Sequence, residues 1–360
     1  MINRKILLCG GGTGGHVLPL VAVARAVKKI APTIEIYFAG PEEFPLDSLR
    51  EEGVIVKKII SAGKLRRYFS WLHIWELVKL PFAFLQSFFV VLAINPNVVL
   101  GKGSYGSILP VVCAKLLFKK IIIHESDAVP GLANKFLSYI TDNIAVAFEE
   151  TKKFFPDKNV YVVGNPVRLK YWETKPNEAE EILGVKTQKP ILFISGGSQG
   201  AQKINRVVLE SLNELLQEYF VIWSVGKNNY SSIKHSVFDR TNIKLFDFLD
   251  ERELAAAYIL CDVALGRAGA GTIFELAAFG KTGILIPLER NGGDQPVNAQ
   301  VYAQTGAAVV LKESELSKTA LLEKISQALN QKDELSRNAQ KFAKIEAAER
   351  LAQILLDLAS

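Results

Sequence analysis

The chain has 360 residues, which is enough for two domains of ordinary size. Its composition, 49% hydrophobic and 22% charged, argues against an intrinsically disordered protein. The net charge of +6 is modest for this length and comes without a dense run of lysine and arginine, so we expect no nucleic-acid partner and favour anionic lipid or a phosphorylated small molecule.

The cysteines indicate the compartment. Cys9, Cys113 and Cys261 lie far apart in apolar runs, a pattern that suggests neither a disulfide framework nor a metal site. A reducing cytoplasm fits this usage. Residues 1–8 lead directly into a glycine-rich loop, and we therefore expect no signal peptide.

The first half alternates short β-prone runs with segments of helical spacing, such as Val17–Lys29. This alternation predicts an α/β fold with a doubly wound, mostly parallel sheet. The predicted strands are Lys5–Cys9, Glu35–Phe38, Asn97–Leu100, Lys120–His124 and Asn143–Ala147.

The second half repeats the pattern after Pro190, and Gly164-Asn165-Pro166 is the expected hinge. We predict two Rossmann-like domains, residues 1–165 and 166–340, facing a shared cleft. The segment 341–360 belongs to a C-terminal helix, expected at Leu335–Leu358, that can pack back on the first domain. The strands predicted in this half are Ile191–Ser195, Phe220–Val225, Ile243–Phe246, Val263–Gly266 and Gly283–Pro287.

Two glycine-rich loops, residues 10–16 and 196–201, each follow a predicted buried strand and open a helix. Such a turn directs unpaired backbone N–H groups and the positive end of a helix dipole at one point, which suits a phosphate. The first loop also fits the dinucleotide fingerprint G-x-G-x-x-G, but the acid expected about 20 residues later is not clearly placed. The duplication predicts a phosphate-bearing ligand between two similar halves.

Candidate acid–base groups follow two strands of the first half. His16 lies where the first loop meets its helix, and it serves either as a general base or as a capping or phosphate-contacting residue. His124-Glu125-Ser126-Asp127 is a second candidate set, with simple closure of the strand as the alternative for each member.

The second half offers groups for a nucleotide and a sugar. Ser198 can add a hydroxyl to the second loop, and the amide-rich loop 291–298 suits sugar hydroxyls. Glu275 follows a further glycine turn, 266–271, where it either favours the helix dipole or accepts both hydroxyls of a ribose.

Taken in order, these motifs resemble the MurG family, the transferases that add N-acetylglucosamine (GlcNAc) from UDP-GlcNAc to undecaprenyl-diphospho-muramoyl-pentapeptide (lipid I), giving lipid II. The resemblance implies a GT-B fold and metal-independent inversion at the anomeric carbon, with no cofactor. It runs through residues 11–16, Gly164-Asn165-Pro166-Val167-Arg168, residues 196–201, Arg267 to Ala270 with Glu275, and Asp294-Gln295 with Asn298-Ala299.

The resemblance also implies roles for single residues. His16 becomes the candidate base for the acceptor 4-hydroxyl, and the acceptor is bound chiefly by the first domain. The implied ligand contacts are Thr13, Gly14 and Gly15 near the diphosphate or donor sugar, Arg168 and Ser198 on UDP, Glu275 on the ribose and Gln295 on GlcNAc, with His124, Leu249, Arg267 and Asn298 completing the set.

The chain departs from the family at one position of that set. Asp127 stands where the family typically has an amide, and it either repels a diphosphate or acts as the base itself. Lys102, in the glycine-rich stretch 101–107, adds a charge that would suit a lipid diphosphate.

Residues 64–82 mix cations with aromatic side chains, and an apolar run continues to Ile94. The uninterrupted part is shorter than the roughly 20 residues that span a bilayer, so we predict an interfacial surface instead. For Phe82–Ile94 we favour a helix buried against the sheet. The predicted membrane residues are Leu65, Arg66, Arg67, Phe69, Trp71, Leu72, Ile74, Trp75 and Lys79.

These inferences predict an inverting N-acetylglucosaminyltransferase of peptidoglycan synthesis at the cytoplasmic face of the plasma membrane. Its expected partners are UDP-GlcNAc, lipid I, anionic phospholipid and other cell-wall synthesis proteins. The alternatives are a GT-B enzyme with a diacylglycerol or small acceptor, a UDP-GlcNAc 2-epimerase, which would not need residues 64–82, and a non-catalytic protein that binds lipid-linked sugars.

Overall fold

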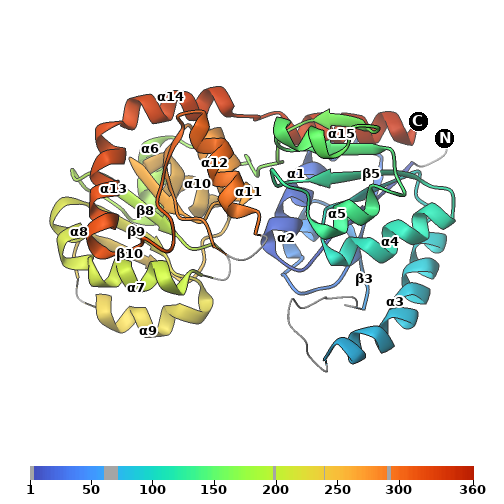
Figure 1. Cartoon of the computed structure of the whole chain (residues 1–360), viewed down its shortest axis with the longest axis horizontal. Coiled ribbons are helices and arrows are strands. Elements are labelled where there is room, and N and C mark those ends of the chain that lie inside the picture. The colour runs from blue at the N-terminus through green and yellow to red at the C-terminus, as the bar shows by residue number, and fades with distance from the viewer. Residues whose placement is uncertain (1–3, 61–71, 198–199, 239, 290–292) are drawn as a thin grey trace. The chain divides into compact units, whose positions relative to one another are not determined.

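A computed structural model describes residues 4–60, 72–197, 200–238, 240–289 and 293–360, without the side chains of residues 72–78. The chain divides into two compact units. Unit 1 comprises Met1–Arg168 and Ile345–Ser360, and unit 2 comprises Leu169–Lys344. Each unit is described by itself (Figure 1).

Unit 1 contains, in its described residues, seven parallel strands in the order β3-β2-β1-β4-β5-β6-β7. The register places Ile6 beside Ile36 on one side and Val98 on the other. The strands are β1 (Lys5–Cys9), β2 (Glu35–Gly40), β3 (Ile55–Lys58), β4 (Val98–Gly101), β5 (Lys120–Glu125), β6 (Asn143–Val146) and β7 (Asn159–Val162). The helices are α1 (Gly14–Ile30), α2 (Asp47–Glu51), α3 (Leu72–Ile94), α4 (Tyr105–Leu116), α5 (Leu132–Leu137), the 3₁₀ helix η1 (Glu149–Phe154) and α15 (Ala347–Ala359).

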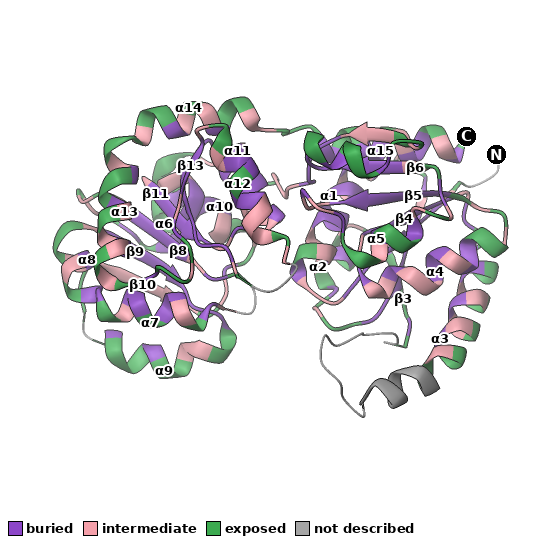
Figure 2. Cartoon of the chain, viewed as in Figure 1, coloured by how far each residue is buried: buried purple, intermediate pink, exposed green. Residues whose placement is uncertain are grey.

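Both faces of this sheet are covered, as the apolar runs of its central strands require. Because successive side chains of a strand point to opposite faces, Ile6 and Leu8 pack with α1 and α15, whereas Leu7 and Cys9 pack with residues of α3 and α4. Figure 2 shows the central strands as buried. Burial also raises the pKa of the Cys9 thiol, as expected of an unreactive core cysteine.

Unit 2 contains, where it is described, six parallel strands in the order β10-β9-β8-β11-β12-β13. The predicted fold class, two doubly wound α/β units with parallel sheets, is confirmed. The strands are β8 (Ile191–Ser195), β9 (Phe220–Ser224), β10 (Ile243–Phe246), β11 (Val263–Gly266), β12 (Thr282–Leu285) and β13 (Ala308–Val310). The helices are α6 (Pro176–Leu183), α7 (Gln202–Glu210), α8 (Leu212–Glu218), α9 (Lys227–Val237), α10 (Glu251–Leu260), α11 (Ala270–Ala278), α12 (Gln295–Gln304), α13 (Lys318–Asn330) and α14 (Lys332–Phe342).

Three strands were not predicted, and all three lie at sheet edges. β3 and β7 are the two edges of the sheet in unit 1, and β13 is one edge of the sheet in unit 2. An edge strand is only partly covered, so it lacks the continuous apolar run of a central strand. β3, with the sequence Ile-Val-Lys-Lys, is mostly exposed and shows this directly.

The prediction of one continuous helix over Leu335–Leu358 is wrong, because the chain forms two helices there. α14 ends at Phe342, the next residue has an extended ψ of 137°, and α15 starts at Ala347. α14 belongs to unit 2, whereas α15 packs in unit 1 through Leu351 and Leu355, in the same core cluster as β1. The helical pattern continues through a break that only the change of unit explains.

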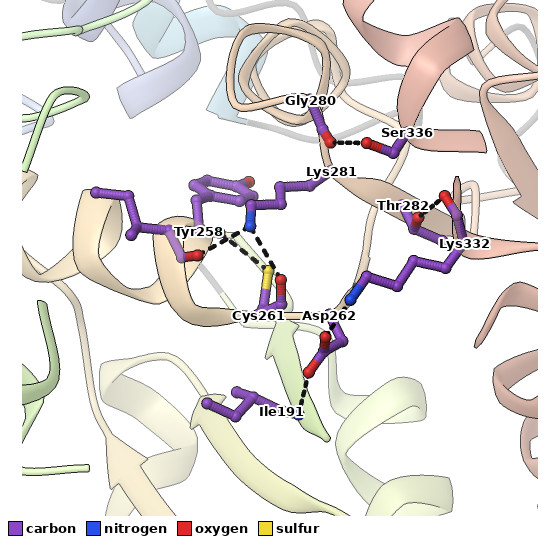
Figure 3. A network of polar contacts seen from close by, with 10 residues as sticks. Ile191, Tyr258, Cys261, Asp262, Gly280, Lys281, Thr282, Lys332 and Ser336 are labelled. Carbon is purple, nitrogen blue, oxygen red and sulfur yellow. Dashed lines mark hydrogen bonds and ion pairs between the residues drawn. The ribbon is translucent and has the colours of Figure 1, made fainter. Parts of the chain in front are cut away.

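A polar network closes the amino ends of the strands in unit 2 (Figure 3). One carboxylate oxygen of Asp262 accepts from the Ile191 N–H at 2.7 Å, and the other pairs with the Lys332 ammonium. Thr282 Oγ1 donates to the Lys332 carbonyl at 3.0 Å, and Ser336 Oγ donates to the Gly280 carbonyl at 2.6 Å. These bonds attach α14 to the amino ends of the strands. The loops that carry the candidate site lie at the opposite, carboxyl ends of the strands.

Candidate functional site

Each sheet reverses its strand order at one point, between β1 and β4 in unit 1 and between β8 and β11 in unit 2. In open α/β sheets ligands bind beyond the carboxyl ends of the strands at such a point, because the loops there leave toward opposite faces. The first glycine-rich loop follows β1 and the second follows β8. Each unit therefore has a candidate ligand-binding site at the carboxyl ends of its strands.

The first loop depends on glycine at two positions. Gly11 and Gly12 have φ values of +133° and +93°, in the region that side chains with a Cβ rarely adopt. A Cβ at Gly12 would lie 3.2 Å from the ring of Tyr105, the first residue of α4. Sequence reasoning did not predict Tyr105 as a site residue, although its glycine-rich surroundings were a usable signal.

The amino end of α1 is open. Its first turn is uncharged at Gly14 and Gly15, and among the described residues a Cβ at Gly15 would meet only the Thr13 hydroxyl, at 3.7 Å. An anionic group can therefore approach the N–H groups of this turn closely. His16 is the third residue of α1 and is half-buried, so its imidazole lies at the same helix end.

Lys102 and His124 belong to a buried hydrogen-bond network. Lys102 is 1% exposed and His124 is fully buried. The Lys102 ammonium donates to His124 Nδ1 at 2.7 Å, to Asn165 Oδ1 at 3.2 Å and to the Ser126 hydroxyl. The expected contacts of Lys102 with a lipid diphosphate and of His124 with substrate stay predictions.

Glu125 organises the loop after β5, residues 126–131. One of its carboxylate oxygens accepts from the Asp127 N–H at 3.0 Å; the other accepts from the Gly131 N–H at 3.0 Å and the Asn134 amide at 2.9 Å. Burial raises the pKa of Glu125. Because these bonds hold the carboxylate, Glu125 stabilises the conformation of the loop. Of the predicted acid–base set, Ser126 and Asp127 lie in the loop itself, and both are half-buried.

The second glycine-rich loop is described in part, because Ser198 lies outside the described residues. Gly197 has a φ of +77°, and no described atom lies within 4 Å of a Cβ built there. A Cβ built at Gly269 or Gly271, at the start of α11, would likewise meet no described atom within 4 Å. Both turns at the switch point of unit 2 thus leave room for a ligand to approach the backbone.

Arg267 follows β11 and is held by the protein. Its guanidinium pairs with the Glu313 carboxylate and donates to the Ile286 carbonyl at 3.2 Å. This arrangement fixes the side chain beside the glycine turn that opens α11. The positive charge of Arg267 is therefore balanced by Glu313 within unit 2.

Glu275 is half-buried in the second turn of α11, and the Tyr258 hydroxyl donates to its Oε2 at 3.1 Å. The Tyr258 ring is fixed by two aromatic neighbours, edge-on to Phe193 and stacked on Phe279, each with centroids 5.2 Å apart. Burial raises the pKa of Tyr258 well above its ordinary value, so it remains a donor. No sequence pattern predicted Tyr258 as a site residue, because it contacts Glu275 from another helix.

The remaining residues that were predicted to bind UDP-GlcNAc differ in exposure. Gln295, half-buried, begins α12 and accepts from the Leu288 N–H at 2.9 Å, whereas Asn298 is fully buried and donates to the Ala268 carbonyl at 3.3 Å. Leu249 is also buried. Arg168 is half-buried at the end of unit 1. Asn298 thus supports the loop after β11, and its expected contact with the ligand stays a prediction.

The membrane prediction falls largely on residues that cannot be described. Leu65, Arg66, Arg67, Phe69 and Trp71 lie outside the described residues. Leu72, Ile74 and Trp75 lie in α3, but their side chains are not described, and Lys79 is exposed. Among the helices of the described part of the chain, none is both long and apolar enough to cross a bilayer.

The expectation that the segment Phe82–Ile94 is buried on all sides is wrong. Ala83, Ser87 and Val91 form its buried side. The opposite side is 50–64% exposed and consists of large apolar side chains at helical spacing, namely Phe82, Leu85, Phe89 and Leu92. Figure 2 shows these alternating exposures along α3. An apolar helix face of this size that no described residue covers is typical of an interaction surface.

Two family models match the chain: the glycosyltransferase family 28 N-terminal domain over residues 6–146 and the corresponding C-terminal domain over residues 191–354. A relative from Borrelia hermsii, named UDP-N-acetylglucosamine–N-acetylmuramyl-(pentapeptide) pyrophosphoryl-undecaprenol N-acetylglucosamine transferase, is 33% identical over 98% of this chain and 97% of its own. The N-terminal family model covers the glycine-rich loop after β1, and the C-terminal family model covers the one after β8.

Solved structures share the fold at lower identity. Acinetobacter baumannii MurG superposes with a TM-score of 0.72 and 22% identity, covering 98% of this chain and 99% of that one. A putative UDP-N-acetylglucosamine 2-epimerase from Listeria monocytogenes gives 0.73 and 14%, over 98% and 95% of the two chains. The GT-B prediction is confirmed, while the fold by itself does not distinguish a transferase from an epimerase.

The buried ammonium yields a prediction on stability. Burial lowers the pKa of Lys102 to about 8, although the charges of Glu125 and Asp127 act in the opposite direction. Between about pH 8 and the ordinary value of 10.5 the unfolded chain keeps this proton and the native state has released it, so native stability rises with pH. Relative to Lys102→Met, the wild-type free energy of unfolding should gain on the order of 3 kcal/mol across this interval.

Denaturant unfolding of both proteins at several pH values measures this difference, because titrations common to both cancel. Lys120→Met, which removes an exposed lysine from β5, controls for loss of one positive charge. A wild-type advantage that stays constant from about pH 8 to 10 would contradict the lowered pKa of Lys102 in the native state.

Proposed function

This chain belongs to glycosyltransferase family 28 as a member of the MurG family, and on this premise we propose that it transfers GlcNAc from UDP-GlcNAc to lipid I, giving lipid II in peptidoglycan synthesis. The family resemblance predicted from the motifs is confirmed, and the chain is an N-acetylglucosaminyltransferase. The assignment of these substrates rests on 33% identity, over nearly the whole length of both chains, to a relative that is named for this reaction.

We assign the donor to unit 2. The open turns at Gly197 and at Gly269 to Gly271 support a diphosphate there, and Glu275 supports recognition of the ribose. Gln295, at the amino end of α12, is the proposed contact to GlcNAc. In this assignment helix N-termini stabilise the negative charge of the departing UDP, and no divalent ion is needed for that purpose.

We assign the acceptor to unit 1 and the proton transfer to His16 or Asp127. His16 lies at the amino end of α1, and Asp127 lies in the loop after β5. Only β4 separates β1 from β5, so these two groups follow strands on either side of the same neighbour. Attack of the acceptor hydroxyl opposite the departing UDP would invert the anomeric carbon.

The competing epimerase reading shares the fold and the donor. An epimerase needs no acceptor and no apolar surface such as the exposed side of α3. The exposed apolar side of α3 and the named relative therefore favour the transferase.

The direct test is transfer of labelled GlcNAc from UDP-GlcNAc to a short-chain lipid I analogue in the presence of EDTA, with release of UDP followed in parallel. Labelled disaccharide-lipid and UDP should form in equal amounts. Tight binding of UDP-GlcNAc without transfer would move the assignment to another acceptor, and formation of the 2-epimer would move it to the epimerase.

The same assay identifies the base. Of His16→Ala and Asp127→Ala, the variant that removes the base should lose about 10²–10⁴-fold in turnover while its affinity for UDP-GlcNAc changes little. If both variants turn over within a few-fold of the wild type, neither residue is the base.

A second prediction concerns how Glu275 is held. Tyr258→Phe removes the hydroxyl that donates to Glu275, so we expect the KM for UDP-GlcNAc to rise about threefold to tenfold with little change in kcat. Binding of 2′-deoxy-UDP should change less than binding of UDP, because the lost contact concerns a ribose hydroxyl.

Tyr302→Phe is the matched control. Tyr302 is also buried in unit 2, and its hydroxyl has no hydrogen-bond partner among the described residues. Equal donor KM values for the two variants would show that Tyr258 does not act through Glu275.

We also propose that unit 1 binds the cytoplasmic face of the plasma membrane as a peripheral protein. The exposed side of α3 supplies the apolar contact, Lys79 lies one turn before it, and the predicted segment 64–75 precedes it in the chain. Aromatic and aliphatic side chains of such a face enter the headgroup layer, while lysine and arginine are attracted to anionic lipid.

Phe82→Ser with Phe89→Ser should therefore weaken binding to vesicles that contain anionic phospholipid, by about tenfold or more, without changing affinity for UDP. Phe238→Ser, at a position 71% exposed in unit 2, is the matched control and should bind vesicles like the wild type. Undiminished binding of the double variant in a vesicle sedimentation assay would rule out this face.

A further inference from the structure

The ammonium of Lys102 joins three segments of unit 1 that are far apart in sequence. Lys102 follows β4, and its backbone N–H still pairs with the Cys9 carbonyl of β1 at 2.8 Å. The three hydrogen bonds of its ammonium go to His124 at the end of β5, to Ser126 in the loop 126–131, and to Asn165 after β7. A single cation thus connects the ends of β4 and β5 with the segment that follows β7.

Packing alone does not account for this charge. A lysine that is 1% exposed has been taken out of water, and its three hydrogen-bond partners are uncharged, so no direct ion pair replaces its hydration. An apolar side chain of similar length would fill the same space, and such replacements of buried charges are often neutral or stabilising. The charge therefore points to a role other than stability.

We propose that Lys102 is a positioning residue for the acceptor side of the site, which holds His124 in one tautomer and the loop 126–131 in one conformation against Asn165. The proposal rests on the proposed function, in which unit 1 binds a lipid-linked diphosphate.

The hydrogen bonds determine the state of His124. The Gly164 carbonyl, 2.9 Å from Nε2, can only accept, so Nε2 carries the proton. An ammonium can only donate, so Nδ1 accepts from Lys102. Burial and the charge of Lys102 both keep the pKa of His124 far below its ordinary value. His124 is therefore a neutral strut between Lys102 and Gly164.

The charge of Lys102 also balances the loop after β5. The charged and titratable groups that act on Lys102 and on its partner His124 are His124 itself, Glu125 and Asp127. Without the cation, the two carboxylates would leave this loop negative, which opposes binding of an anionic diphosphate. Loss of Lys102 should consequently weaken the acceptor and spare the donor.

The experiment compares Lys102→Met with Lys120→Met, which removes an exposed lysine from the same sheet. The KM for a short-chain lipid I analogue should rise about tenfold or more in Lys102→Met, while the affinity for UDP stays within about twofold of the wild type. Lys120→Met should match the wild type in both measurements.

Histidine ¹⁵N NMR supplies a readout that general destabilisation would not mimic. The chain has four histidines, so His124→Gln assigns the signal of His124. In the wild type this signal should be that of the Nε2–H tautomer, with Nδ1 shifted by its bond to the ammonium, and Lys102→Met should move Nδ1. Ser126→Ala, which removes one of the three bonds, should raise the acceptor KM about twofold to fivefold and serves if Lys102→Met does not fold.

An unchanged acceptor KM together with an unchanged His124 signal in Lys102→Met would overturn the proposal. A parallel loss of UDP affinity in a folded variant would also overturn it, because the effect would not be confined to the acceptor. Absence of transfer by the wild type would instead count against the proposed function, and the His124 signal would still test whether Lys102 holds this side chain.

Discussion

The constraint on which the rest of the structure depends is that the central strands of both sheets are buried on two faces. A strand such as β1 or β8 has no solvated side, so a polar group within it would need a buried partner. Polar and charged chemistry is thereby confined to the loops beyond the strand ends. The carboxyl ends carry the glycine turns and candidate ligand groups, whereas in unit 2 the amino ends carry the Asp262 network that fastens α14.

This constraint explains why charges near the site are held by the protein rather than left free. Lys102, Glu125 and Arg267 all follow or end a buried strand, and each is bonded to backbone groups or neighbouring side chains. Groups fixed in this way cannot reorganise when a ligand binds, which is the condition for electrostatic preorganisation.

Burial of the central strands does not explain the exposed apolar side of α3 in unit 1. α3 contributes one side to the core, whereas its other side exposes large apolar groups. In the proposed function this face contacts the membrane that holds the lipid-linked acceptor, and the loops at the carboxyl ends of the strands in unit 1 bind the diphosphate of the same acceptor.

The sequence by itself determined the fold class, the two units and the family. Central strands were predicted almost to the residue, because burial on both faces demands continuous apolar runs, and glycine turns were found because positive φ values demand glycine. Tertiary structure alone decided the edge strands β3, β7 and β13, the break between α14 and α15, and the exposure of α3, since each depends on what covers a segment. It also decided that Lys102 and His124 point inward and that Tyr258 reaches Glu275, because side chains from distant segments meet only after the sheets have formed.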